Sequence, residues 1–94
     1  MVSFNKKEFN QYVEKELSKL GFNEIIKPEC LENITENISN ILQNYMGDVL
    51  AGDEPKQLYN QHYEKKILSF WNKNKNCIKS GKLELTLEKT RSLF

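Results

Sequence analysis

The sequence NKKEFNQYVEKELSKLGF, residues 5–22, has the clearest structural pattern in this chain, that of an amphipathic helix with a marked end. Its apolar residues recur at steps of four, four and three: Phe9, Val13, Leu17 and Leu20. That spacing places them on one face of a helix. Gly21 can adopt the left-handed conformation that ends many helices, and Phe22 can then fold back on Leu17. We therefore predict a helix over about residues 5–20.

The start of this helix is marked as well. Asn5 is a suitable N-cap, and Glu8, three residues later, completes a capping box. Phe4 and Phe9 occupy the two positions of a hydrophobic staple around that cap. Local residues thus specify both ends of the element.

A second helix is predicted over about residues 28–46, with Pro28 in its first turn, where a missing N–H group costs nothing. Its apolar positions fall mostly at steps of three and four: Leu31, Ile34, Ile38, Ile41, Leu42, Tyr45 and Val49. Gly47 and Gly52 each cost up to about 1 kcal/mol inside a helix. We therefore expect a break near residues 46–48, followed by a short helix or turn.

A third helix is predicted over about residues 54–73. Asp53 can cap it, and Pro55 fits its first turn. The residues expected on its buried side are Leu58, Tyr59, Tyr63, Ile67, Phe70 and Trp71. The helix should end in the run from Asn72 to Asn76, which has no apolar residue.

The basic tail, residues 74–94, fits two structures. Leu83, Leu85 and Leu87 alternate with polar residues, which is a strand period, and Ser80-Gly81 could turn a short hairpin. Alternatively, residues 84–93 form a helix that uses two of those leucines. We predict the extended segment or hairpin. The fold class is then all-α, a single domain over residues 1–94 with an array of three to four amphipathic helices.

Composition narrows the class of protein. A content of 38% hydrophobic and 29% charged residues is typical of a globular chain rather than a disordered one. No apolar run is long enough for a transmembrane span or a signal-peptide core, so we expect an intracellular protein that does not bind membranes. Cys30 and Cys77 are then expected to be two reduced thiols. The glycosylation patterns at Asn33 and Asn37 are interpreted as chance matches on a helix.

Charge is unevenly distributed. Residues 1–55 contain five Lys against ten Asp or Glu, a net charge of −5, whereas residues 56–94 contain nine Lys or Arg against three Glu, a net charge of +6. This asymmetry indicates that the C-terminal half either contacts an acidic partner or packs on the acidic half.

No pattern of catalytic or metal-binding residues is present. The single histidine, His62, lies between two tyrosines on a predicted helix and has no partner for base catalysis. One His and two distant Cys do not have zinc-ligand spacing, and the residues around Asp48 and Asp53 lack the pattern of a calcium loop. There is no glycine-rich phosphate loop. We predict a protein that is not an enzyme and takes no cofactor, metal or small-molecule substrate.

Two binding functions remain. A late cluster of basic residues could contact a nucleic-acid backbone. It contains a single arginine, and the predicted helices are longer than those of a winged helix. The residues of this cluster are Lys65, Lys66, Lys73, Lys75, Lys79, Lys82, Lys89 and Arg91. The helices also carry more apolar surface than a bundle of 94 residues easily covers, which favours a partner helix bound in a groove. We predict the second function, with a small basic nucleic-acid-binding protein as the alternative.

One segment resembles a known family. The pattern Val13-x3-Leu17-x3-Gly21-Phe22-x-Glu24-x-Ile26-Lys27-x2-Cys30-x-Glu32-x-Ile34 is similar to the enhancer-of-yellow family of transcription and mRNA export factors. Ile41-Leu42 with Leu50 looks like the third helix of that family, and Lys66-Ile67-x2-Phe70-Trp71 looks like its last helix. The resemblance covers about residues 12–72. The family usually has another short helix before the match, where this sequence has only about a dozen residues, and this sequence adds a basic tail, residues 73–94.

The resemblance implies a noncatalytic subunit of a nuclear assembly that wraps around a long helix of a larger scaffold protein. The residues that would line the groove or the core behind it are Leu17, Phe22, Ile26, Ile34, Ile41, Tyr45, Ile67 and Phe70. The segments 20–36 and 82–88 are also similar to histone-fold transcription-factor subunits. In that fold, however, the central helix would have to run through Gly47 and Gly52.

Overall fold

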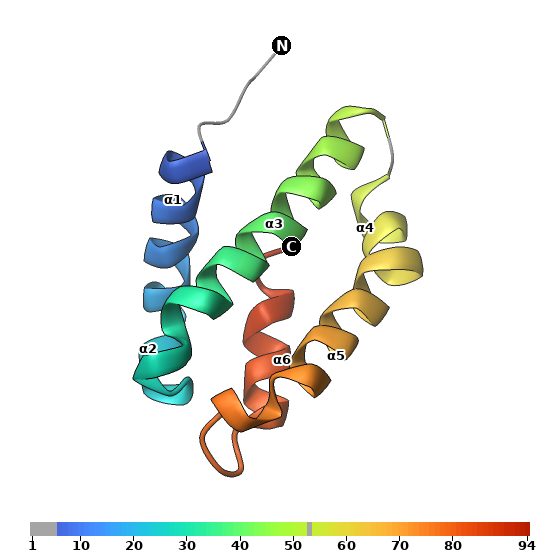
Figure 1. Cartoon of the computed structure of the whole chain (residues 1–94). Coiled ribbons are helices and arrows are strands. Elements are labelled where there is room, and N and C mark those ends of the chain that lie inside the picture. Colours follow the sequence, from blue (N-terminus) through green and yellow to red (C-terminus); the bar gives the residue numbers. More distant parts are fainter. Residues whose placement is uncertain (1–5, 53) are drawn as a thin grey trace.

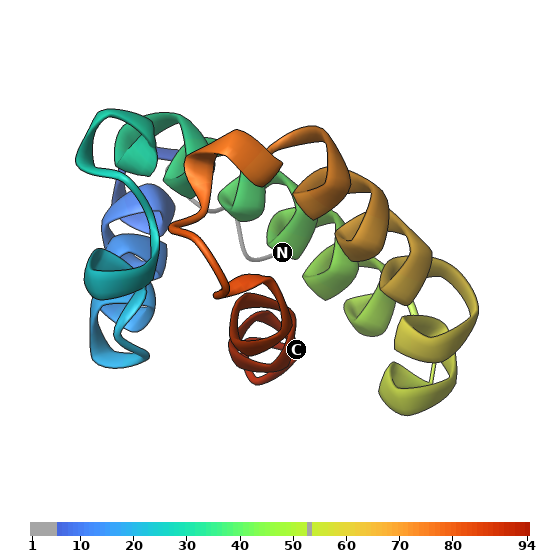
Figure 2. The same ribbon diagram turned by 90° about the horizontal axis from the view of Figure 1, so that it is seen from below.

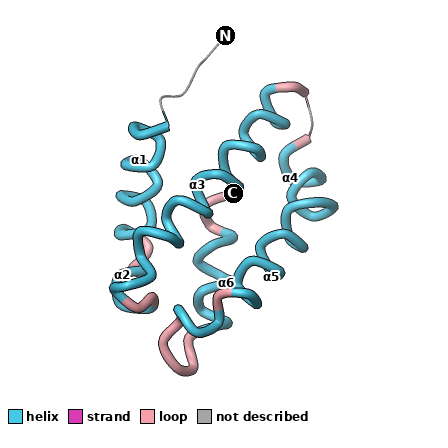
Figure 3. Tube along the Cα trace, in the orientation of Figure 1, coloured by secondary structure: helices cyan, strands magenta, loops and turns pink. Residues whose placement is uncertain are grey.

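The computed structural model describes residues 6–52 and 54–94, so the predicted caps at Phe4, Asn5 and Asp53 lie outside the described residues. Figures 1 and 3 show these residues as helices and connecting loops, which confirms the all-α class. The α-helical segments are α1 (Lys6–Lys19), α2 (Phe22–Ile25), α3 (Leu31–Leu50), α4 (Pro55–Leu58), α5 (Glu64–Lys73) and α6 (Leu83–Arg91). A π-helical segment, Tyr59–Tyr63, joins α4 to α5. With α4–α5 taken as one continuous helix, the described residues form five helices, where three to four were predicted.

The first predicted helix is confirmed as α1. Phe9, Val13 and Leu17 are its buried residues, as their spacing indicates. Gly21 follows with φ of 84°, in the left-handed region that favours glycine. The chain then makes the single turn of α2, which buries Phe22 against the same core.

The predicted break near residues 46–48 is wrong, because α3 continues through Gly47 to Leu50. The last turns of α3 are held by tertiary contacts that local propensity does not include. Tyr45 is buried there, and the Tyr63 hydroxyl donates a hydrogen bond of 2.8 Å to Oδ2 of Asp48. These contacts offset the cost of glycine, which is only about 1 kcal/mol.

The third predicted helix is confirmed over Pro55–Leu58, Tyr59–Tyr63 and Glu64–Lys73. Four of its six expected residues are buried, and two, Tyr59 and Phe70, are partly buried. The π-helical segment adds a residue to one turn, as single π turns inside α-helices do. The four buried residues therefore lie on the inner side of one long helix: Leu58, Tyr63, Ile67 and Trp71.

The predicted strand or hairpin in the tail is wrong. Residues 83–91 form α6, and Ile78 pairs in an isolated antiparallel bridge with Ile26 rather than with its own tail. The fully buried residues of α6 are Thr86 and Thr90, while Leu83 and Leu87 are partly buried against the core and Leu85 is exposed. The leucine alternation therefore has no structural role as a strand pattern.

A large hydrophobic core joins the helices, and a smaller one contains Tyr45, Leu58 and Tyr63. The buried members of the large core come from α1, α2, α3 and α5 and from the bridge residues Ile26 and Ile78, and leucines of α6 pack against them. α1 packs against α3, and α5 packs against α6. Figure 2 shows α6 beside α1 and below the layer that α3 and α5 form. The tail is thus part of the fold.

The prediction of two reduced thiols is also wrong, because Cys30 and Cys77 form a disulfide with a Cα–Cα distance of 5.8 Å. The two cysteines lie in the connections before α3 and after α5. The bridge residues Ile26 and Ile78 join the same two connections, through backbone hydrogen bonds from Lys27 to Cys77 and from Lys79 to Ile25. A covalent bond and a pair of hydrogen bonds therefore tie these connections together.

Candidate helix-binding surfaces

The side chains that could bind a metal ion lie apart from one another in the part of the chain that the structure describes. The one histidine, His62, is exposed on the π-helical segment. Among residues 6–52 and 54–94, no three His, Cys, Asp or Glu side chains are grouped as metal ligands would be. No helix in these ranges is both long and apolar enough to cross a membrane. The surfaces to consider are those between helices.

The first surface is the α6 seat, which we define as the side of α1, α3 and α5 that α6 covers. At its centre, Nε1 of Trp71 donates a hydrogen bond of 3.0 Å to Oγ1 of Thr90. The Thr90 hydroxyl in turn donates to the carbonyl oxygen of Thr86, at 2.7 Å. All three side chains have no solvent-exposed surface. A buried polar group must be hydrogen-bonded to avoid a large cost, so this pairing fixes the position of α6.

Two charged side chains of α6 hold its edges. Nζ of Lys89 donates to the carbonyl oxygen of Leu20, near the end of α1. The Arg91 guanidinium binds the Glu64 carboxylate through two nitrogens, with Nε 3.0 Å from Oε1. The Arg91 contact lowers the pKa of Glu64 and so keeps the carboxylate ionised.

An aromatic cluster of Tyr45, Tyr59, Tyr63 and Phe94 closes the end of the seat. The Phe94 ring lies 5.0 Å from that of Tyr45 and 5.3 Å from that of Tyr59, between ring centroids. The Tyr59 hydroxyl is buried near the Glu64 carboxylate and makes no close hydrogen bond among the described residues. Burial raises the pKa of this phenol above its usual range, and the nearby Glu64 carboxylate raises it further.

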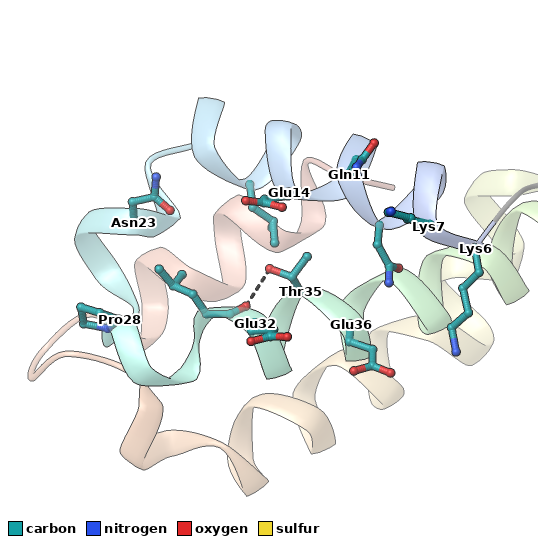
Figure 4. Close-up of a pocket in the computed structure, with 12 residues that line it drawn as sticks. Lys6, Lys7, Gln11, Glu14, Asn23, Pro28, Glu32, Thr35 and Glu36 are labelled. Carbon is teal, nitrogen blue, oxygen red and sulfur yellow. Dashed lines mark hydrogen bonds between the residues drawn. The ribbon is translucent and has the colours of Figure 1, made fainter.

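The second surface is the α1–α3 groove, a depression of about 890 Å³ between these two helices. Figure 4 shows acidic and amide side chains along it, with Lys6 and Lys7 at one end and Pro28 at the other. Three residues supply its apolar lining: Leu17, Pro28 and Leu31. Its acidic residues are Glu14, Glu32 and Glu36. The groove therefore combines a small apolar floor with carboxylates along its sides.

The eight residues predicted to line a groove or the core behind it lie mainly in the core. The buried ones are Leu17, Phe22, Ile26, Ile34, Tyr45 and Ile67. Ile41 and Phe70 are partly buried and pack against that core. Leu17 is the one of the eight that also lines the α1–α3 groove.

Sequence reasoning missed Leu31, Glu32 and Glu36 as groove residues. Position provided a signal, since Glu32 and Glu36 are four residues apart and therefore share one side of the second helix. It also missed Thr86 and Thr90, whose burial has no signal in a hydrophobic pattern. Threonine at a four-residue spacing is ordinary on an exposed helix face.

The basic residues divide between two environments. Six lysines of the late cluster are exposed: Lys65, Lys66, Lys73, Lys75, Lys79 and Lys82. Lys89 and Arg91 instead hold α6 against α1 and α5. Two of the eight basic side chains in this cluster therefore make contacts within the chain itself.

Comparison of this chain with models of protein families, with curated proteins and with solved structures finds no match.

Proposed function

We propose that this chain is a noncatalytic subunit that binds a helix of a larger scaffold protein in the α1–α3 groove. The observation that supports this function is the groove itself, which runs between two helices and has an apolar floor at Leu17 and Leu31. A third helix can pack against two others when its apolar side chains fill the space between them. Binding a helix in this groove requires only apolar and charged side chains, and the groove has both.

The charge of the groove specifies the partner further. Glu32 and Glu36 are exposed along α3, and Glu14 is exposed on α1. A helix with apolar residues on one side and Lys or Arg beside them would match both features. Affinity then comes mainly from the buried apolar floor, and the carboxylates at the rim contribute to specificity and to the rate of association.

The nuclear transcription or mRNA-export assembly is part of this proposal on the basis of the sequence resemblance alone. Disulfides are rare in nuclear and cytosolic proteins, so the bond between Cys30 and Cys77 favours an oxidising compartment. The redox state of these cysteines in the cell separates the two locations. Alkylation of free thiols in rapidly quenched cells would support the nuclear assembly, and unreactive cysteines would contradict it.

A charge-reversal experiment tests the groove. The double variant Glu32→Lys/Glu36→Lys changes two exposed residues of α3, so the fold should be retained. The matched control Glu84→Lys/Glu88→Lys makes the same charge change at exposed positions of α6. A scaffold protein isolated with the native chain should bind the control as it binds wild type and bind the groove variant at least tenfold more weakly. Equal binding to both variants would exclude the groove.

A second candidate function is favoured by one observation. The connection between α5 and α6 exposes Lys75, Lys79 and Lys82, and residues 72–83 contain no acidic residue. We propose, as the alternative, that this connection contacts a nucleic-acid backbone. Such binding weakens steeply between low and moderate salt, whereas binding to an apolar groove does not. Strong, salt-sensitive binding of DNA or RNA by the isolated chain would make this the primary function.

A further inference from the structure

We propose that α6 exchanges between two copies of this chain, so that in a dimer each copy's α6 fills the seat of the other. This inference goes beyond the groove function and concerns a different surface. It rests on three features of the structure: the fit of α6 to its seat, the connection that joins α6 to the rest of the chain, and the low net charge.

The seat accepts a narrow range of occupants. Trp71 requires a hydrogen-bond acceptor within the seat, and Glu64 requires a cation at its edge. Without α6, the Trp71 N–H group and the apolar core beneath α6 would be left uncovered, which is unfavourable. When α6 leaves, a helix with the same pattern of residues must therefore replace it, and a second copy carries that helix in an identical form.

The connection before α6 can change its path without disturbing the seat. Residues 80–82, which we call the hinge, are all exposed. The hinge begins just after the disulfide at Cys77, the bridge at Ile78 and the backbone hydrogen bond from Lys79 to Ile25, which hold the preceding residues in place. Its own turn is closed by one backbone hydrogen bond of 3.2 Å, from Lys82 to Lys79. The contacts that hold α6 are made outside the hinge, so they can form equally with a second copy.

The turn in the hinge depends on Gly81, whose φ is 77°. This left-handed conformation folds α6 back onto its own copy, and it is unfavourable for residues with a Cβ atom. An extended hinge, which exchange allows, does not need it. The net charge of the chain is only +1, so repulsion between two copies is small.

Two glycine variants test the hinge. Gly81→Val penalises the turn that keeps α6 on its own copy, and Cβ at this position would contact no other residue. The matched control is Gly52→Val, since Gly52 also has positive φ, 111°, and open space but lies in the connection between α3 and α4. By sedimentation equilibrium, Gly81→Val should dimerise at least tenfold more tightly than wild type, because an exchanged dimer relieves two strained turns, each worth roughly tenfold. Gly52→Val should associate as wild type does.

A monomeric Gly81→Val chain, or equal dimerisation of both glycine variants, would overturn the proposal.

A second experiment identifies the exchanged element through the ion pair between Glu64 and Arg91. Glu64→Arg and Arg91→Glu each place like charges together within one chain. If α6 exchanges, an equimolar mixture restores both ion pairs in a mixed dimer and melts at a higher temperature than either variant alone. The chain that carries both changes restores the pair internally and serves as the control. A mixture that stays monomeric and melts as its components do would exclude exchange of α6.

Discussion

The indole Nε1 of Trp71 and the hydroxyl Oγ1 of Thr90 form a hydrogen bond of 3.0 Å where neither side chain is exposed to solvent. The two residues come from α5 and α6, 19 positions apart in the chain. Thr90 also donates to the carbonyl oxygen of Thr86, so its hydroxyl is used both as an acceptor and as a donor. This satisfied polar pair explains how a helix with few buried apolar residues holds a fixed position against the core.

Thr90→Val should lower the free energy of unfolding by about 1–3 kcal/mol, because it leaves the buried Trp71 N–H group without an acceptor. Thr86→Val is the matched control. Thr86 is equally buried, but its hydroxyl donates to the carbonyl oxygen of Lys82, which already accepts the backbone N–H of Thr86. Thr86→Val should therefore lower the free energy of unfolding by less than about 1 kcal/mol. Urea denaturation followed by Trp71 fluorescence measures both, and equal losses would contradict the role given to Thr90.

Reduction of the disulfide should destabilise the chain by about 4 kcal/mol, the chain-entropy effect of a cross-link that closes a loop of this length. Cys30 and Cys77 are 47 positions apart, and the bond joins the connection before α3 to the connection after α5. The measurement is denaturation with and without reductant. The double variant Cys30→Ser/Cys77→Ser is the control, and its stability should not respond to reductant. If the stability of the wild-type chain is also unchanged by reductant, the disulfide does not form in solution.

The ion pair between Glu64 and Arg91 should give the stability a dependence on acid pH. Arg91 lowers the pKa of Glu64 from its ordinary value of 4.5, so the folded state favours the ionised carboxylate. The resulting stabilisation is complete above that ordinary value and is lost as the pH falls through the lower pKa of the folded state. Because the Arg91 side chain is 46% exposed, this stabilisation should amount to about 1 kcal/mol or less.

The variant Glu64→Gln isolates this contribution. It should be less stable than wild type at pH 7, and the difference should disappear in acid once Glu64 is protonated. Thermal unfolding at a series of pH values between 7 and 2 provides the comparison. A difference that stays constant over this range would show that the ion pair is not its source.

Two tyrosines should respond differently to loss of the hydroxyl group. Tyr59→Phe removes a buried hydroxyl that lies near the Glu64 carboxylate but makes no close hydrogen bond among the described residues, so stability should change little. Tyr63→Phe removes the hydrogen bond to Asp48 and should cost about 1 kcal/mol. Chemical denaturation of the two variants tests the pair, and a larger loss for Tyr59→Phe would place a partner on its hydroxyl.

The sequence predicted best where the signals are local. The spacing of Phe9, Val13 and Leu17, with Gly21 after them, defines α1 to within a residue at each end. It predicted less well where contacts between distant residues decide. Gly47 indicates a break by propensity, yet packing at Tyr45 keeps α3 helical beyond it. Among the groove residues, only Leu17 and Leu31 followed from the hydrophobic pattern, because polar groove residues have no such pattern.

By itself, the sequence determined that this chain is helical and where its three long helices lie, because apolar residues at helical spacing and glycine or proline at the ends act within a few residues of the chain. The tertiary structure alone decided the tail and the cysteines. Leu83, Leu85 and Leu87 fit a strand and a helix equally, and α6 forms because its residues meet Trp71, Glu64 and the carbonyl of Leu20, which is 69 positions from Lys89. Cys30 and Cys77 pair because the fold brings two connections together, and proximity between distant segments is a property of packing that no local pattern encodes.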